Sequence, residues 1–230
     1  MPVGEKYLHV QSKIDEIAVK CGRDPKEISL VAVTKGYELD HVMPAYDAGC
    51  RDFGESRLQE VLDKIPNAPD DLRWHLIGTL QKNKVRKVVG KFVLIHSVDS
   101  SDLAAKISQC SQEVGVVTPV LLQANTSGEQ SKHGLTPEEW TSIFGEVVNL
   151  PGISVKGLMT MAPLEGDEIV IRNCFSKLRE LREDLQKMAG EDVRIPHLSM
   201  GMTHDYPYAI AEGATILRIG TAIFGYTHSE

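Results

Sequence analysis

Short apolar runs recur along the chain, and turn-forming residues bound each of them. Eight such runs predict β-strands at 28–34, 51–54, 74–78, 92–97, 118–124, 153–159, 197–200 and 216–220. Several are apolar throughout and do not alternate, as expected for parallel strands that are buried on both faces. The pattern therefore predicts a parallel sheet in the interior of the protein.

Helical patterns fill most of the intervals between these runs. The sequence Thr136-Pro137-Glu138-Glu139 predicts a helix start with an N-cap, a proline in the first turn and a capping-box glutamate. A short helix is expected after Asp205 and ends at Gly213. Over 169–188, apolar residues repeat with a period near 3.6 at Ile171, Cys174, Phe175, Leu178, Leu181, Leu185 and Met188.

Alternating strands and helices indicate a parallel sheet with helices outside, and eight strands are enough to close a TIM-type (β/α)₈ barrel. An extra N-terminal helix precedes the first strand, with one apolar stripe at Tyr7, Val10, Ile14, Ile17 and Cys21. The chain ends soon after the eighth strand, so this helix is expected to fill the place of the last one. A doubly wound open sheet is the alternative. Without a linker or repeat, residues 1–230 are expected to form a single domain.

The composition narrows the classes of function. The chain has 230 residues, 42% of them hydrophobic, which supports a sizeable core. Its formal net charge of −7 argues against general nucleic-acid binding. The N-terminus lacks a signal-peptide pattern and no apolar run has membrane-spanning length, so a cytoplasmic protein is expected. No histidine–carboxylate spacing indicates a metal site, and the four scattered cysteines are expected to be reduced and mostly buried.

In barrels of this kind the functional residues lie at the C-terminal ends of the strands. Lys35 follows the first apolar run directly. Partial desolvation there would lower its pKa and free the amine to attack an aldehyde. The alternative is a strand-end lysine that reaches solvent.

The segment 217–225 predicts a phosphate site at the end of the eighth strand. Gly220 allows a close backbone approach, Thr221 adds a hydroxyl, and residues 199–202 supply the neighbouring half of the site. A rim of small residues with glycine turns explains the segment equally well. Arg218 points inward if the strand alternates, where it needs a carboxylate or a ligand as a partner.

Other polar residues favour structural interpretations. His75 lies within a strand and is expected to be a hydrogen-bonded core histidine. The basic stretch 82–91 is expected to be a solvated helix surface, with an anion-binding patch as the alternative. His204 and Asp205 lie at the rim, where they could bind substrate, although a helix cap explains Asp205 equally well.

At these residues the sequence resembles the pyridoxal phosphate homeostasis proteins, a family of single barrels similar to the N-terminal domain of bacterial alanine racemases. The similarity extends over nearly the whole chain. It is carried by Ala32-Val33-Thr34-Lys35, Phe53-Gly54-Glu55, the stretch from Trp74 to Lys84, Gly157-Leu158-Met159, Leu198-Ser199-Met200-Gly201-Met202 and the stretch from Arg218 to Gly225.

The resemblance implies that Lys35 forms an internal aldimine, a Schiff base, with pyridoxal 5′-phosphate. It also implies that Ser199, Gly220 and Thr221 hold the phosphate and that Arg218 faces the pyridine nitrogen. Ser56 stands where this family often has asparagine, which puts a side-chain contact near the cofactor in doubt.

The leading hypothesis is a protein of intracellular pyridoxal phosphate homeostasis that carries the cofactor with little or no turnover, and no residue is assigned a catalytic role. Its expected partners are pyridoxal phosphate and apo-enzymes that need it, and a monomer is expected rather than an oligomer. The alternatives are a weak amino-acid racemase and a phosphate-binding barrel enzyme without pyridoxal phosphate. A racemase needs a second acid/base, which alanine racemases take from a second domain that this chain is expected to lack. Tyr206, Tyr208 and His204 are the rim residues that could replace it.

Overall fold

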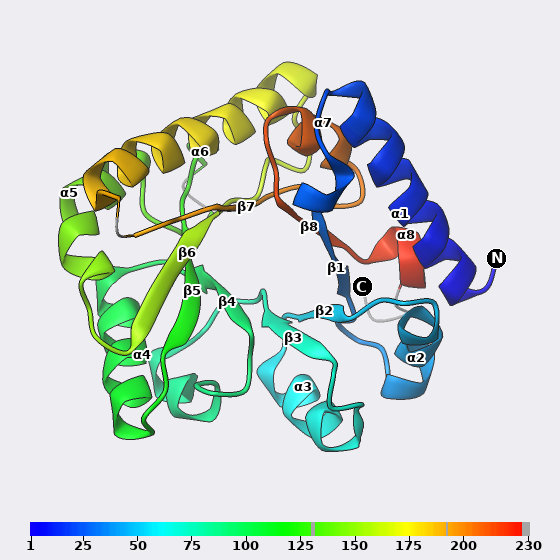
Figure 1. Cartoon of the computed structure of the whole chain (residues 1–230), viewed down its shortest axis with the longest axis horizontal. Helices are drawn as coiled ribbons and strands as arrows, with labels where there is room; N and C mark the ends of the chain where they lie inside the picture. Colours follow the sequence, from blue (N-terminus) through cyan, green and yellow to red (C-terminus); the bar gives the residue numbers. More distant parts are fainter. Residues whose placement is uncertain (130–131, 192, 227–230) are drawn as a thin grey trace.

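Eight parallel strands close into a barrel in the computed structural model, which describes residues 1–129, 132–191 and 193–226 (Figure 1). The strands follow one another around the barrel in chain order, and β8 pairs with β1. They are β1 Ser29–Val33, β2 Asp52–Glu55, β3 Arg73–Leu76, β4 Leu94–Val98, β5 Thr118–Gln123, β6 Ile153–Met159, β7 His197–Ser199 and β8 Ile216–Ile219. All eight predicted strands are confirmed to within two residues at each end, and the closed barrel excludes the open-sheet alternative.

Helices surround the barrel, and none within the described ranges is long and apolar enough to cross a membrane (Figure 1). The α-helices are α1 Val3–Lys20, α2 Leu39–Asp47, α3 Leu58–Lys64, α4 Ser101–Glu113, α5 Pro137–Val148, α6 Glu168–Ala189, α7 Tyr206–Ala211 and α8 Thr221–Phe224. The short 3₁₀ helices are η1 Pro25–Glu27, η2 Ile65–Asn67 and η3 Lys82–Lys87. The last of these, rather than an α-helix, connects β3 to β4.

The N-terminal helix α1 packs against α2, α7 and α8 and so completes the outer layer next to β8 and β1, as predicted (Figure 1). Val10, Ile14 and Ala18 form its buried stripe. The prediction that Cys21 continues this stripe is wrong. The helix ends at Lys20, and Cys21 lies exposed at its C-cap.

The predicted start of α5 is confirmed in detail. The Thr136 hydroxyl accepts a hydrogen bond from the Glu139 amide, and the Glu139 carboxylate accepts one from the Thr136 amide. Such a capping box satisfies two amides that the first turn of a helix leaves unpaired. The predicted helix ending at Gly213 corresponds to α7.

The core has an outer and an inner part. The larger part lies between the sheet and the helices. A small apolar cluster of residues from alternate strand positions fills part of the barrel interior: Val31, Leu94, Leu121, Met159 and Ile216. Because every second strand residue points inward, polar side chains that follow these positions lie inside the barrel as well.

Gly157 provides a test of the β6–β7 junction. Its φ is +153°, and a Cβ there would lie 2.0 Å from the His197 carbonyl oxygen on the paired strand. Gly157→Ala is therefore expected to lower the free energy of unfolding by about 3 kcal/mol, measured by urea denaturation. Gly145→Ala is the matched control, since this exposed helical glycine has open space at its Cβ and should gain about 0.5–1 kcal/mol. Equal effects at both positions would contradict this account of the barrel.

Candidate functional site

The ends of β1 and β8 lie side by side at the C-terminal mouth of the barrel. Ala32 pairs with Ile219, and a Cβ on Gly220 would lie 3.1 Å from the Val33 carbonyl oxygen. Glycine therefore allows the end of β8 to approach β1 closely. The closure brings the turn that contains Lys35 next to the start of α8 at Thr221, although the two residues lie far apart in the sequence.

The short helix α8 also packs on the loop that follows Lys35. The rings of Phe224 and Tyr37 lie 5.5 Å apart, and Tyr37 in turn stacks on His41 of α2. This aromatic contact links the two loops that form this side of the mouth.

Lys35 is exposed, whereas Thr34 before it is fully buried. The expected partial desolvation of Lys35 is therefore wrong. The strand ends at Val33 and Lys35 lies in the turn beyond it, so its side chain reaches solvent at the mouth. Its location at the end of the first strand is as predicted.

Arg218 points into the barrel, as predicted, and is 5% exposed. Its guanidinium donates one hydrogen bond to the Ser199 hydroxyl oxygen at 2.6 Å and one to the Thr160 carbonyl oxygen at 2.9 Å. Burial lowers the Arg218 pKa to about 10, with the charge of Asp205 opposing the shift, so the group remains a cation at neutral pH. Two of its five N–H groups thus bond to described residues, and both of these partners are neutral.

Ser199 is also fully buried, at the end of β7. Its hydroxyl accepts from Arg218 and lies 2.9 Å from Nδ1 of His96. The structure therefore brings two of the predicted site residues, Ser199 and Arg218, into direct contact. A contact between Ser199 and a phosphate stays a prediction.

Below Lys35 lies a buried ion pair that the sequence analysis missed. Lys64 of α3 contacts Glu55 with an N–O distance of 2.5 Å, and the Thr34 hydroxyl donates to the same carboxylate oxygen at 2.6 Å. Lys64 also donates to the Thr34 carbonyl oxygen at 3.2 Å. Burial raises the pKa of the Glu55 carboxyl, while its bonds to Lys64 and Thr34 oppose this shift. These contacts fix the residue that precedes Lys35.

A second group of polar residues in the barrel interior was only partly anticipated. His75 is a buried, hydrogen-bonded histidine, as predicted, but its partners Asp52 and His96 were missed. Thr160 follows the sixth strand, where functional residues are expected, but the hydrogen bond from Arg218 to its backbone carbonyl oxygen was not predicted. The available signal was polar residues at inward positions of otherwise apolar strands.

The remaining candidates lie around the rim. Ser56 is half-buried, and its backbone lies close to Gly78. A Cβ added to Gly78 would lie 2.1 Å from the Ser56 carbonyl oxygen. Asp205 stands at the N-cap position of α7, but its side chain makes no capping hydrogen bond to that helix; its carboxylate accepts instead from the Met202 amide. The side chains of Lys82, Lys84, Arg86, Lys87 and Lys91 are all exposed, and two of them pair with acidic residues of α4.

Comparison with known proteins adds to this geometry. The family model of the alanine racemase N-terminal domain matches residues 9–228 of this chain. A pyridoxal phosphate homeostasis protein of Aquifex aeolicus is 41% identical over 222 residues, which cover 96% of each chain. The chain belongs to the pyridoxal phosphate homeostasis protein family.

Solved structures agree with this family assignment. PipY of Synechococcus elongatus, in a structure with pyridoxal phosphate bound, is 35% identical with a TM-score of 0.85, covering 97% of this chain and 100% of PipY. A crystal structure of an unknown protein from Bifidobacterium adolescentis is 41% identical with a TM-score of 0.91, covering 97% and 94% of the two chains. The resemblance inferred from the sequence is thereby confirmed.

The buried pair below Lys35 generates a prediction about stability. Lys64→Met leaves the Glu55 carboxylate buried without its cation and is expected to cost about 3–5 kcal/mol of unfolding free energy at pH 7. Because burial raises the pKa of Glu55, the cost should shrink as the pH falls and the carboxyl takes up a proton. Urea denaturation between pH 5 and pH 8 measures both effects. The double variant Glu55→Gln/Lys64→Met should recover part of the loss, and a cost independent of pH would contradict the assignment.

Proposed function

We propose that this protein binds pyridoxal 5′-phosphate at the mouth of its barrel and holds it for intracellular cofactor homeostasis, with little or no turnover. The observation that carries the proposal is the buried cation of Arg218 beneath a mouth whose rim carries the Lys35 amine and the Thr221 hydroxyl. The name of the relative in Aquifex aeolicus and the cofactor bound to PipY support it.

The groups at the mouth fit the three chemically distinct parts of this cofactor. Lys35 supplies an amine for the aldehyde, and Arg218 supplies N–H donors for the pyridine nitrogen. Thr221 supplies a hydroxyl for the phosphate, where the first-turn amides of α8 are not used by the helix itself. Gly220 leaves the space that a close backbone approach requires.

Lys35 is proposed to hold the cofactor covalently. Its amine attacks the aldehyde carbon, a carbon–nitrogen double bond forms, and the carbonyl oxygen leaves as water. The exposed position of Lys35 makes the amine accessible to cofactor from solution. The buried contacts of Thr34 with Glu55 and Lys64 hold the backbone from which Lys35 projects.

Arg218 limits what the site can catalyse. When bound, the cofactor supplies an aldehyde and an electron-withdrawing ring, and protonation of the ring nitrogen strengthens the ring as an electron sink. A guanidinium has only N–H donors, so Arg218 can donate a hydrogen bond to an unprotonated ring nitrogen. It cannot accept a hydrogen bond from a protonated one. This favours holding the cofactor over converting amino acids.

The rim tyrosines support the same conclusion. The Tyr208 ring packs under the Arg172 guanidinium of α6 at 5.4 Å. Tyr206 lies near Lys13 and Glu16 of α1, and burial raises its pKa. Both tyrosines thus interact with outer helices, which argues against either one serving as the second acid/base of a racemase.

The remaining parts of the proposal concern the cellular setting. Apo-enzymes that require pyridoxal phosphate are the proposed recipients, and the protein is proposed to act as a cytoplasmic monomer with a single domain. All four cysteines are free thiols, and three of them are buried, which supports a reducing compartment.

Lys35→Ala is expected to abolish covalent retention of the cofactor. The loaded wild-type protein should show a visible absorbance band that borohydride removes, and mass spectrometry should map the reduced adduct to Lys35. Lys91→Ala is the control, because this exposed lysine lies away from the mouth. An adduct on any lysine other than Lys35 would refute the assignment.

Thr221→Val should weaken the affinity for pyridoxal phosphate by about 1.5–3 kcal/mol, the usual contribution of a hydrogen bond to a charged group. Affinity for pyridoxal, which lacks the phosphate, should change little. Thr221→Ser keeps the hydroxyl and should behave as the wild type, and titration calorimetry measures all three proteins. If the wild type bound pyridoxal as tightly as pyridoxal phosphate, the phosphate site would be placed wrongly.

A further inference from the structure

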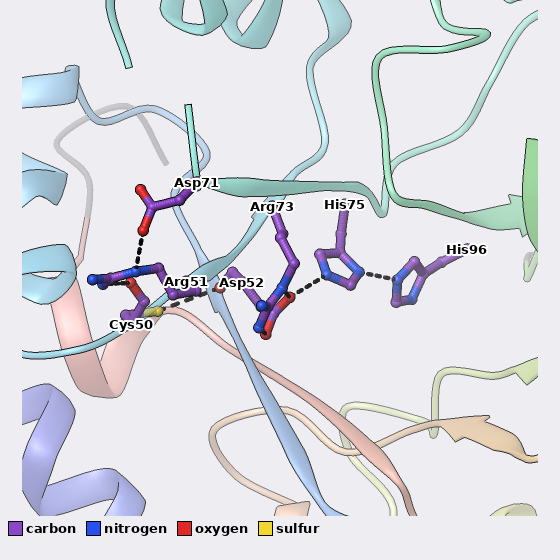
Figure 2. A network of polar contacts seen from close by, with 7 residues as sticks. All are labelled: Cys50, Arg51, Asp52, Asp71, Arg73, His75 and His96. Carbon is purple, nitrogen blue, oxygen red and sulfur yellow. Dashed lines mark hydrogen bonds and ion pairs between the residues drawn. The ribbon is translucent and has the colours of Figure 1, made fainter. Parts of the chain in front are cut away.

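A continuous line of polar contacts runs through the barrel from the start of β2 to the site at β8. Nε2 of His75 lies 3.0 Å from the Asp52 carboxylate, and Nδ1 of His75 lies 3.0 Å from Nε2 of His96 (Figure 2). Nδ1 of His96 lies 2.9 Å from the Ser199 hydroxyl, which accepts from Arg218. We call these five residues the interior chain.

The two ends of the interior chain have fixed roles. Arg218 has donors only, so the Ser199 oxygen must accept from it. Asp52 accepts hydrogen bonds from both Arg73 and His75 (Figure 2). Burial opposes the ionisation of Asp52, but the hydrogen bonds from Arg73 and His75 outweigh it and hold the pKa of Asp52 below its usual value. A cation therefore ends the chain on one side and a carboxylate on the other.

These ends determine the direction of every bond between them. Burial lowers the pKa of the His96 imidazole well below its usual value, with the charge of Arg218 adding to the effect, so His96 carries one ring proton. With that proton on Nε2, Ser199 donates to His96, His96 donates to His75, and His75 donates to Asp52. Each hydrogen in the chain then has an acceptor.

The opposite tautomer of His96 does not satisfy the chain. With the proton on Nδ1, the Ser199 oxygen would receive hydrogen bonds from both Arg218 and His96. The hydroxyl hydrogen of Ser199 would then have no acceptor among the described residues. A buried unpaired donor costs about 1–3 kcal/mol, so the directed arrangement is favoured.

The directed chain is also arranged to stabilise the buried charge of Arg218. The acceptor atoms of Ser199, His96 and His75 all lie on the side toward Arg218, and the chain ends at the Asp52 carboxylate, which is also paired with Arg73. Aligned hydrogen bonds strengthen one another in a medium of low dielectric constant. The guanidinium is thus stabilised by aligned hydrogen bonds together with the charge of Asp205, and the hydrogen bonds it donates to described residues go to neutral oxygens.

We propose that Asp52, His75 and His96 are positioning residues that act through the Ser199 hydroxyl and hold the Arg218 guanidinium in one orientation for a bound cofactor. They act through four successive hydrogen bonds that all donate toward Asp52. In this arrangement the single hydroxyl hydrogen of Ser199 donates to His96 and not to a phosphate. The role toward the cofactor rests on the proposed function, whereas the direction of the chain is a property of the protein alone.

Nitrogen NMR of the protein without cofactor, labelled in its imidazole rings, tests the direction. His75 and His96 should both carry their proton on Nε2, and His96 should keep this form from pH 6 to pH 9. A proton on Nδ1 of His96 would overturn the proposal. Because no cofactor is present, failure of the proposed function would leave this result unaffected.

Asp52→Asn tests the coupling over the length of the chain. Removing the terminal charge should alter the NMR signals of the His96 ring, which lies two hydrogen bonds away. It should also shift the visible band of the bound cofactor and weaken the affinity for the cofactor about fivefold, the equivalent of one hydrogen bond. Asp71→Asn is the matched control, since it removes a nearby carboxylate that pairs with Arg51 outside the chain (Figure 2). Asp71→Asn should leave the His96 ring signals, the visible band and the affinity unchanged.

His96→Asn provides a second, independent break in the chain. Its amide oxygen can accept from Ser199, but asparagine is too short to reach His75, so the local contact survives while the connection to Asp52 is lost. The band should shift as it does in Asp52→Asn, whereas His9→Asn, which changes an exposed histidine of α1 outside the chain, should leave it unchanged. If either chain variant retained both the wild-type band and the wild-type affinity, Asp52, His75 and His96 would have no positioning role.

Discussion

Closure of the sheet between β1 and β8 is the constraint on which the rest of the structure depends. The pairing of Val31 with Arg218 and of Ala32 with Ile219 sets the alternation of inward side chains on these two strands. A barrel of eight strands has an interior that side chains fill, so polar groups placed there must satisfy one another. The same closure brings Lys35 and Thr221 to one part of the rim, although nearly the whole chain separates them in sequence.

Among the residues that the structure describes, the buried cations Lys64 and Arg218 are stabilised in different ways. Lys64 is paired directly with Glu55, and the pair serves to anchor the strand end at Thr34. Arg218 instead donates to the neutral oxygens of Ser199 and Thr160, while the charge of Asp205 acts on it in addition to these two contacts. A carboxylate in direct contact would occupy the N–H donors of the guanidinium and neutralise its charge. Without such a contact, the charge and the remaining N–H donors of Arg218 stay available to a ligand.

Most of the fold could be predicted because a strand buried on both faces is apolar whatever its neighbours are, and caps such as Thr136 are local. The inward direction of Arg218 followed from strand alternation alone. The contacts of His96 with residues on β3 and β7 could not be predicted, since they depend on the stagger between strands up to 103 residues apart. The exposure of Lys35 depends on where β1 ends, which an apolar run defines only to within a residue or two.

The most direct test of the central claim is a crystal structure of the protein loaded with pyridoxal phosphate. The account predicts continuous density from the cofactor to Nζ of Lys35, the pyridine nitrogen within hydrogen-bond distance of the Arg218 guanidinium, and the phosphate at Thr221. The contacts of Arg218 with Ser199 and Thr160 should persist. Cofactor bound elsewhere, or bound at the mouth with its ring nitrogen away from Arg218, would contradict the account.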